Sequence, residues 1–115
     1  MEEALEVIGR NGLGPVRDAG LLDSALARPQ ASAIGEDVYA TINLKAAALL
    51  HSIVNNHSLI DGNKRLALSL TYLFLVMNGY YLAMSQGELF DFMIEVASTS
   101  ISAQELELKL KVAAL

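Results

Sequence analysis

The segment from His57 to Arg65 combines residue types that can bind a phosphorylated ligand and move a proton. Histidine is the usual general base of proteins, so His57 can take a proton from a hydroxyl nucleophile. Asp61 can hold Mg²⁺, which binds through one or two carboxylates together with substrate phosphates. Gly62 lets the backbone approach a ligand closely, and Lys64 and Arg65 supply two cations. The spacing therefore predicts a base, a metal carboxylate and an anion site within nine residues.

The two cations stand where the sequence predicts the start of a helix, at Gly62-Asn63. The first turn of a helix has unpaired N–H groups and the positive end of the macrodipole. Without a ligand, Lys64 and Arg65 each cost about 0.3–1 kcal/mol there, and a bound polyphosphate would reverse the sign of that cost. Asn63 tolerates unusual backbone angles and adds to the adaptability of the turn.

Taken one at a time, these residues have simpler interpretations. His57 continues an apolar helical stripe and fits a packed boundary position, Asp61 fits a helix cap, and Lys64-Arg65 fits a solvated helix start. Their coincidence favours a site, because only four charges occur between Val38 and Gly87, and three of them fall within five positions.

Composition excludes several other classes of function. The chain has 115 residues, of which 53% are hydrophobic and 18% charged, so it is predicted to form one globular domain over 1–115. No cysteine is present, which excludes disulfides and thiolate chemistry. A net charge of −5 argues against direct nucleic-acid binding. The apolar stretch after Leu66 is too short for a membrane span, the beginning of the chain is acidic unlike a signal peptide, and a cytoplasmic location is expected.

The elements that must position these residues are helices. Met1–Arg10 forms a short helix, Asp18 caps a second that Pro29 ends, and apolar residues from Ala46 to Val54 recur with helical spacing until Asn55-Asn56. The central helix runs from Gly62-Asn63 to Asn78-Gly79 and is apolar on nearly every side. Capping boxes, Ser85-x-x-Glu88 and Ser102-x-x-Glu105, open the last two helices, the final one offering Leu106, Leu110 and Val112 for packing. Gln30–Ala40 lacks a helical period and predicts a loop or short hairpin. The sequence predicts an all-α bundle of about six helices.

His57 to Arg65 resembles the signature motif of the Fic/Doc family, and the Asn63-Lys64-Arg65 ending is similar to its Doc (death-on-curing) branch. The resemblance extends over the N-terminal segment Arg17–Pro29 and the helix Ala46–Ser52, and covers about residues 13 to 110. It implies a compact helical bundle with a small β-hairpin flap. It further implies that His57 is the general base, that Asp61 serves the metal, and that Gly62, Asn63, Lys64 and Arg65 bind the phosphates of ATP with Mg²⁺.

The resemblance also implies a biological role. Doc proteins are toxins of toxin–antitoxin systems, protein kinases that phosphorylate a threonine of elongation factor Tu and inhibit translation. A Phd-like antitoxin neutralises them by folding a segment onto the active-site groove. The flap, at Ala33, Ile34, Gly35, Val38 and Tyr39, is expected to dock the target beside the site.

Four departures from the family pattern bear on the reaction or its inhibition. AMP-transferring relatives carry a second arginine where this chain has Leu68, and glycine where it has Lys64. The family's usual phenylalanine is Leu59 here, a smaller apolar anchor for the loop. The nearest match to an inhibitory helix, Ser32-x-x-x-Glu36, lies in a segment without helical pattern, which favours inhibition by a partner. A Fic-type AMP transferase and a non-catalytic helical interaction module remain the alternatives.

Overall fold

The computed structural model describes residues 1–33, 35–98 and 100–115. This part of the chain contains six α-helices, a short 3-10 helix and two small antiparallel sheets, which confirms the predicted helical bundle. The helices are α1 (Glu2–Arg10), α2 (Ala19–Ala27), η1 (Arg28–Gln30, the 3-10 helix), α3 (Ile42–Asn56), α4 (Asn63–Met77), α5 (Gln86–Ser98) and α6 (Ala103–Lys109). The strands are β1 (Ser32–Ala33), β2 (Glu36–Asp37), β3 (Tyr80–Leu82) and β4 (Val112–Ala114).

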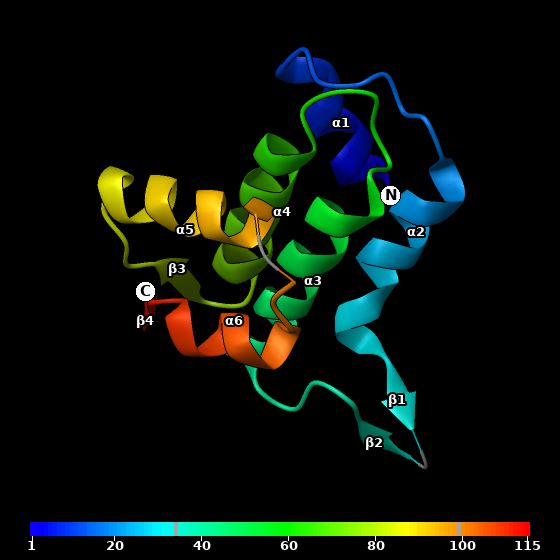
Figure 1. Cartoon of the computed structure of the whole chain (residues 1–115). Coiled ribbons are helices and arrows are strands. Elements are labelled where there is room, and N and C mark those ends of the chain that lie inside the picture. Colours follow the sequence, from blue (N-terminus) through cyan, green and yellow to red (C-terminus); the bar gives the residue numbers. More distant parts are fainter. Residues whose placement is uncertain (34, 99) are drawn as a thin grey trace.

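Helices α3 and α4 form the centre of the bundle, with α2 beside α3 and α5 and α6 on the other side (Figure 1). The apolar stripe predicted from Ala46 to Val54 is buried along its whole length. Leu50 and Ile53 of α3 and Leu66 and Leu75 of α4 have no measurable exposure. Burying such side chains stabilises the fold by about 1.5–3 kcal/mol each, so the two central helices are held rigidly at the core.

Side-chain caps fix where several helices begin. The Asp18 carboxylate accepts from the Leu21 N–H at 3.0 Å at the start of α2. The Ser102–Glu105 box opens α6 with reciprocal bonds, and the Ser85–Glu88 pair does the same before α5. All three predicted caps are confirmed, and each typically contributes about 1 kcal/mol.

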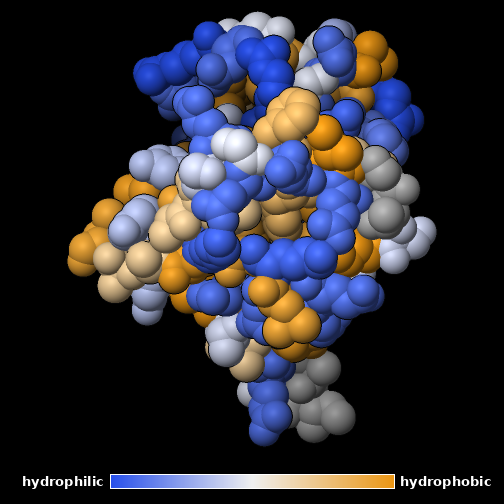
Figure 2. Space-filling view, turned by 60° about the vertical axis from the view of Figure 1, so that its left-hand side comes forward, coloured by the Kyte–Doolittle hydropathy of each residue, from blue (hydrophilic) through white to orange (hydrophobic). Residues whose placement is uncertain are grey.

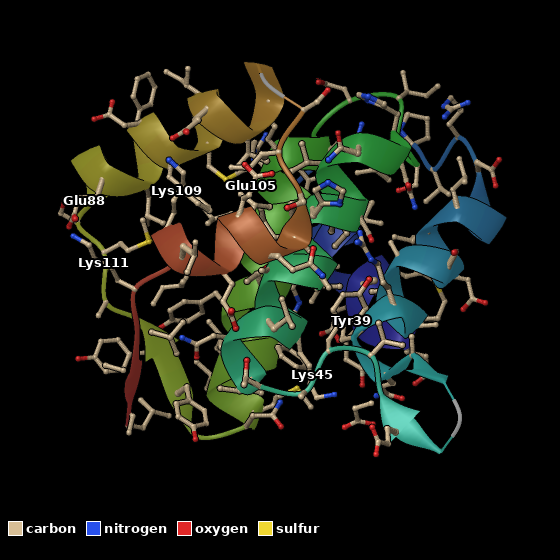
Figure 3. All side chains as sticks on the ribbon, turned by 60° about the horizontal axis from the view of Figure 1, so that its bottom comes forward. Tyr39, Lys45, Glu88, Glu105, Lys109 and Lys111 are labelled. Carbon is tan, nitrogen blue, oxygen red and sulfur yellow. The ribbon has the colours of Figure 1, made fainter. Side chains whose placement is uncertain are left out.

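The end of the chain differs from the prediction. Helix α6 ends at Lys109, and Val112 belongs to β4, which pairs with β3 through Tyr80↔Ala114 and Leu82↔Val112. The partners lie about thirty residues apart, and three-residue strands show too little alternation to be recognised locally. Glu88 at the start of α5 pairs with Lys111 beside this sheet, and Figure 3 shows the two side chains pointing toward each other.

The predicted hairpin is present as β1 and β2, with Ser32 opposite Asp37. It projects from the body at the start of α3 (Figure 1). Lys45 ties it to that helix by donating to the Pro29 carbonyl at 3.0 Å and contacting Asp37 at 3.3 Å (Figure 3). Within the described residues, no helix has both the length and the apolar character needed to cross a membrane.

Candidate active site

His57 stands at the junction of the two central helices, in a backbone conformation that side chains rarely adopt. It is the C-cap residue of α3, with φ 50° and ψ 46°, and no other described non-glycine residue has a positive φ. Its side chain is exposed. The helical stripe therefore ends before His57, and the interpretation of this residue as a packed boundary histidine is wrong.

Gly62 makes the second sharp turn of the loop, at the N-cap of α4, with φ 92°. A Cβ at this position would lie 2.9 Å from Leu13 Cδ2. Glycine is thus required by both the backbone angle and the contact with Leu13. Because Gly62 offers no capping side chain, the first N–H groups of α4 are left for another partner.

Residues 14 to 18 run beside the motif loop and brace it with backbone hydrogen bonds. The Gly14 N–H donates to the Asp61 carbonyl at 2.9 Å, and the Ile60 N–H donates to the Pro15 carbonyl at 2.9 Å. The Arg17 N–H donates to the Ser58 carbonyl at 2.7 Å. Leu59, fully buried, pairs across this bridge with Val16. Leucine therefore serves here as the apolar anchor of the loop.

Asn63 closes the loop from the inside. Its side-chain oxygen accepts from the Leu59 N–H and its amide donates to the Leu59 carbonyl, both at 3.0 Å. The Asn63 side chain is therefore bound to the Leu59 backbone within the loop. Binding of phosphate by Asn63 stays a prediction. Arg65 donates to the Asn11 carbonyl at 3.2 Å, which turns part of its guanidinium toward the end of α1.

A cavity of about 550 Å³ opens at this loop. In Figure 2 hydrophilic residues cover most of the upper end of the molecule, where the loop and α1 lie. The cavity brings all six predicted motif residues together with apolar side chains of the loop, α3 and α5. Its lining is Val54, Asn55, His57, Ile60, Asp61, Gly62, Asn63, Lys64, Arg65 and Ala97.

The donor set of the cavity fits a metal that enters with its ligand. Among the described residues, no group of three metal-ligating side chains is found. Asp61 is exposed and is the one carboxylate among the described residues that line the cavity. Mg²⁺ commonly binds through one or two carboxylates plus phosphate oxygens. The residues therefore fit a Mg²⁺ ion shared with a nucleotide.

None of the described hairpin residues lines this cavity, although the resemblance places the hairpin beside the site. It lies at the beginning of α3 and His57 at the end (Figure 1), and a 15-residue helix spans about 22 Å. Tyr39 is buried, whereas Gly35 and Val38 are exposed; Ile34 lies outside the described residues. Target docking by Ala33, Gly35, Val38 and Tyr39 stays a prediction.

A second polar cluster links the base of the hairpin to α3, and no sequence pattern predicted it. Arg28 donates to the Tyr39 hydroxyl at 2.7 Å and to the Ser52 hydroxyl at 2.8 Å. The same guanidinium lies 2.7 Å from Nδ1 of His51. Burial and the neighbouring Arg28 cation lower the pKa of His51 below 6.5. His51 is thus a packing residue whose neutral ring accepts from arginine.

The helical bundle carries a histidine and a cavity lined by two cations at the junction of its two central helices. This is the organisation of the Fic fold. The sequence pattern of the Fic/DOC family matches residues 2–75. Over 68 residues, 59% of this chain, the sequence is 56% identical to a protein named Toxin Doc from Mycolicibacterium smegmatis, of which it covers 52%. The chain therefore spans about half the length of that relative. It belongs to the Fic/Doc family.

Proposed function

We propose that this chain is a Doc-like toxin of a toxin–antitoxin module, a protein kinase that transfers the γ-phosphate of ATP to a threonine of elongation factor Tu and thereby arrests translation. The observation that carries the proposal is the single cavity shared by His57, Asp61 and the N-terminus of α4. A base, a metal carboxylate and an anion site converge there, which is the set that phosphoryl transfer requires.

The anion site supports binding of a nucleotide by its phosphates. Gly62 leaves the first N–H groups of α4 uncapped, and Lys64 and Arg65 stand exposed in the same turn. Uncapped N–H groups, the helix dipole and two cations together favour a polyphosphate. Asp61 would hold the Mg²⁺ that accompanies ATP and neutralises phosphate charge.

His57 supports a role as the general base. His57 is exposed and lines the cavity, and its backbone lies between α3 and the loop. In the proposed reaction, the target hydroxyl gives its proton to His57 as its oxygen bonds to the γ-phosphorus. The bond from that phosphorus to the bridging oxygen breaks, and ADP leaves.

Lys64 and Leu68 favour phosphoryl transfer over AMP transfer. Lysine fills, with its methylene stem, space that glycine would leave for a phosphate beside the helix, and it adds a mobile cation. Leu68, one turn further along α4, provides no charge that would draw the γ-phosphate away from the target. ATP is thus expected to present its terminal phosphate to the hydroxyl. Transfer of AMP is the second candidate, because the other motif residues are those shared across the family.

An antitoxin is the proposed partner, and an apolar groove beside the cavity supports it. Two adjoining hollows of about 440 Å³ each run from Lys64 and Arg65 along α4 and α5. Phe90 on α5 is 66% exposed at this groove. The groove suits an amphipathic helix whose apolar face covers α5 and whose acidic end reaches the two cations. Its lining is Lys64, Arg65, Leu68, Ser69, Tyr72, Leu82, Met84, Gln86, Leu89, Phe90 and Met93.

Intact-mass spectrometry of elongation factor Tu tests the proposal. Elongation factor Tu is incubated with Mg²⁺-ATP and the wild-type chain, and in parallel with the His57→Ala variant. The proposal expects one added phosphate with the wild type and none with the variant. A mass increase of one AMP would contradict phosphoryl transfer and favour the AMP transferase. An unchanged mass would contradict both candidate activities on elongation factor Tu.

A further inference from the structure

Arg17 lies outside the cavity but contacts the backbone that holds His57. Its Nε donates to the His57 carbonyl at 2.9 Å and its terminal nitrogen donates to the same oxygen at 2.6 Å. The terminal nitrogen also reaches the Asn56 carbonyl at 3.5 Å. The acceptors belong to the last residue of α3, Asn56, and to its C-cap residue, His57.

These contacts occur where α3 lacks an ordinary cap. The last carbonyls of a helix have no partner within it, and the left-handed residue that follows is usually glycine. Here that residue is His57, whose side chain makes the left-handed conformation costly. A cation at a helix C-terminus is favourable, and a charged donor makes the stronger kind of hydrogen bond. Arg17, which comes from another segment, therefore provides hydrogen bonds that stabilise a helix end where glycine is the usual residue.

The position of Arg17 is itself fixed on two sides. Its N–H donates to the Ser58 carbonyl at 2.7 Å, and the Asp18 N–H donates to the same carbonyl at 3.1 Å. The Asp18 side chain caps α2. The guanidinium is thus delivered to the end of α3 from a backbone anchored both to the loop and to a neighbouring helix.

We propose that Arg17 is a positioning residue that holds His57 in its left-handed conformation and so aims the imidazole into the cavity. The inference rests on the proposed function only for the role of His57 as a base. Removing the guanidinium releases the His57 backbone and lowers turnover without weakening nucleotide binding, because the phosphate-binding turn of α4 is untouched. A misplaced reacting group commonly costs on the order of 10–100-fold in rate.

The test compares Arg17→Gln, Arg17→Lys and the matched control Arg10→Gln. Arg10 is an exposed arginine of α1 that pairs with Glu6 and does not contact the loop. The amide-to-Hα coupling of His57, measured by NMR, reports its φ without any substrate; kcat and KM for ATP are measured with elongation factor Tu. Assignment is simple because the chain has two histidines.

We expect Arg17→Gln to shift the His57 coupling away from the left-handed value and to lower kcat about 10–100-fold with an unchanged KM for ATP. Arg17→Lys keeps the charge but loses the planar guanidinium, so its His57 coupling and kcat are expected to lie between those of the wild type and Arg17→Gln. If circular dichroism shows that Arg17→Gln is unfolded, the comparison is made with Arg17→Lys. A coupling equal to that of Arg10→Gln would overturn the inference, whatever happens to kcat. If the wild type transfers nothing, the proposed function fails while the coupling still decides the role of Arg17.

Discussion

At the scale of single residues, the motif loop depends on two left-handed positions that serve different ends. His57 adopts φ 50° and is the proposed general base, whereas Gly62 adopts φ 92° and lies against Leu13. The types and spacing of the motif residues were sufficient to predict that they lie together, as they do around one cavity, while their roles stay a prediction. The left-handed conformation of His57 was not predictable, because the contacts that surround this loop come from residues 14 to 18, which are distant in the sequence.

Alanine substitutions at three glycines distinguish the stability cost of a left-handed backbone angle from the cost of a steric clash. Gly9→Ala lies inside α1 with open space around it and is expected to stabilise the fold by about 0.5–1 kcal/mol. Gly12→Ala has φ 63° and open space, so it costs about 1–2 kcal/mol for the angle alone. Gly62→Ala adds the clash with Leu13 and is expected to cost roughly 1–3 kcal/mol more.

Urea unfolding of the three variants measures these free energies. The order Gly9→Ala, Gly12→Ala, Gly62→Ala, from most to least stable, is expected. Equal stability of Gly12→Ala and Gly62→Ala would show that the Leu13 contact does not hold the loop.

Lys64 is the residue on which we predict that the type of transfer depends. Lys64→Gly opens space beside the first turn of α4 and removes a cation, so phosphorylation of elongation factor Tu is expected to fall strongly and AMP transfer to emerge. Lys64→Met keeps the stem and removes the charge, and is expected to reduce phosphorylation without AMP transfer. Intact-mass measurement distinguishes the two products. Undiminished phosphorylation by Lys64→Gly would contradict the proposed role of Lys64 in selecting phosphoryl transfer.

At the scale of elements, helix starts and the core face of α3 were predictable because they depend on local signals. Each of these features involves residues only a few positions apart in the sequence. They are the Asp18, Ser85–Glu88 and Ser102–Glu105 caps and the Ala46–Val54 stripe. The β3–β4 sheet and the Arg28 cluster were not predictable, since both join residues far apart in the sequence. The separation of the hairpin from the cavity follows from α3 being one unbroken helix.

The Arg28 cluster makes the free energy of unfolding depend on pH. The neutral His51 ring accepts from Arg28 and packs by the Ile101 backbone, and burial keeps its pKa in the folded chain below 6.5. Below pH 6.5 the unfolded chain takes up a proton that the folded chain resists, so the free energy of unfolding falls as the pH drops from 6.5 toward the folded pKa. Above pH 6.5 this residue contributes no slope.

Urea unfolding of wild type and His51→Gln on both sides of pH 6.5 checks this dependence. Glutamine keeps an oxygen acceptor for Arg28 and cannot titrate. The difference in unfolding free energy between the two proteins is expected to shift in favour of His51→Gln as the pH falls. A difference that is independent of pH would contradict the sign of the pKa shift.

At the scale of the whole molecule, an acidic chain presents cations at one end. The net charge is −5 with eight lysines and arginines, yet Lys64 and Arg65 line the cavity and Arg17 contacts its loop. This distribution suits an anionic nucleotide at the cavity and leaves the apolar groove between α4 and α5 for a protein partner.

The groove is tested with a peptide of the cognate antitoxin. Phe90→Ala removes the most exposed aromatic side chain of the groove and is expected to weaken binding about tenfold or more in calorimetry. Leu108→Ala on α6, at a position 85% exposed and outside the groove, is the matched control and is expected to bind as the wild type does. ATP binding should be the same in all three proteins. Equal peptide affinity of the two variants would place the partner elsewhere.

The most direct test of the central claim labels ATP at different phosphates. Elongation factor Tu is incubated with the wild type or with His57→Ala and with ATP labelled at either the γ- or the α-phosphate. We predict that the wild type incorporates the γ-label alone and that His57→Ala loses about 10²–10⁴-fold of that rate while remaining folded. Incorporation of the α-label by the wild type, or an undiminished γ-label with folded His57→Ala, would contradict the account.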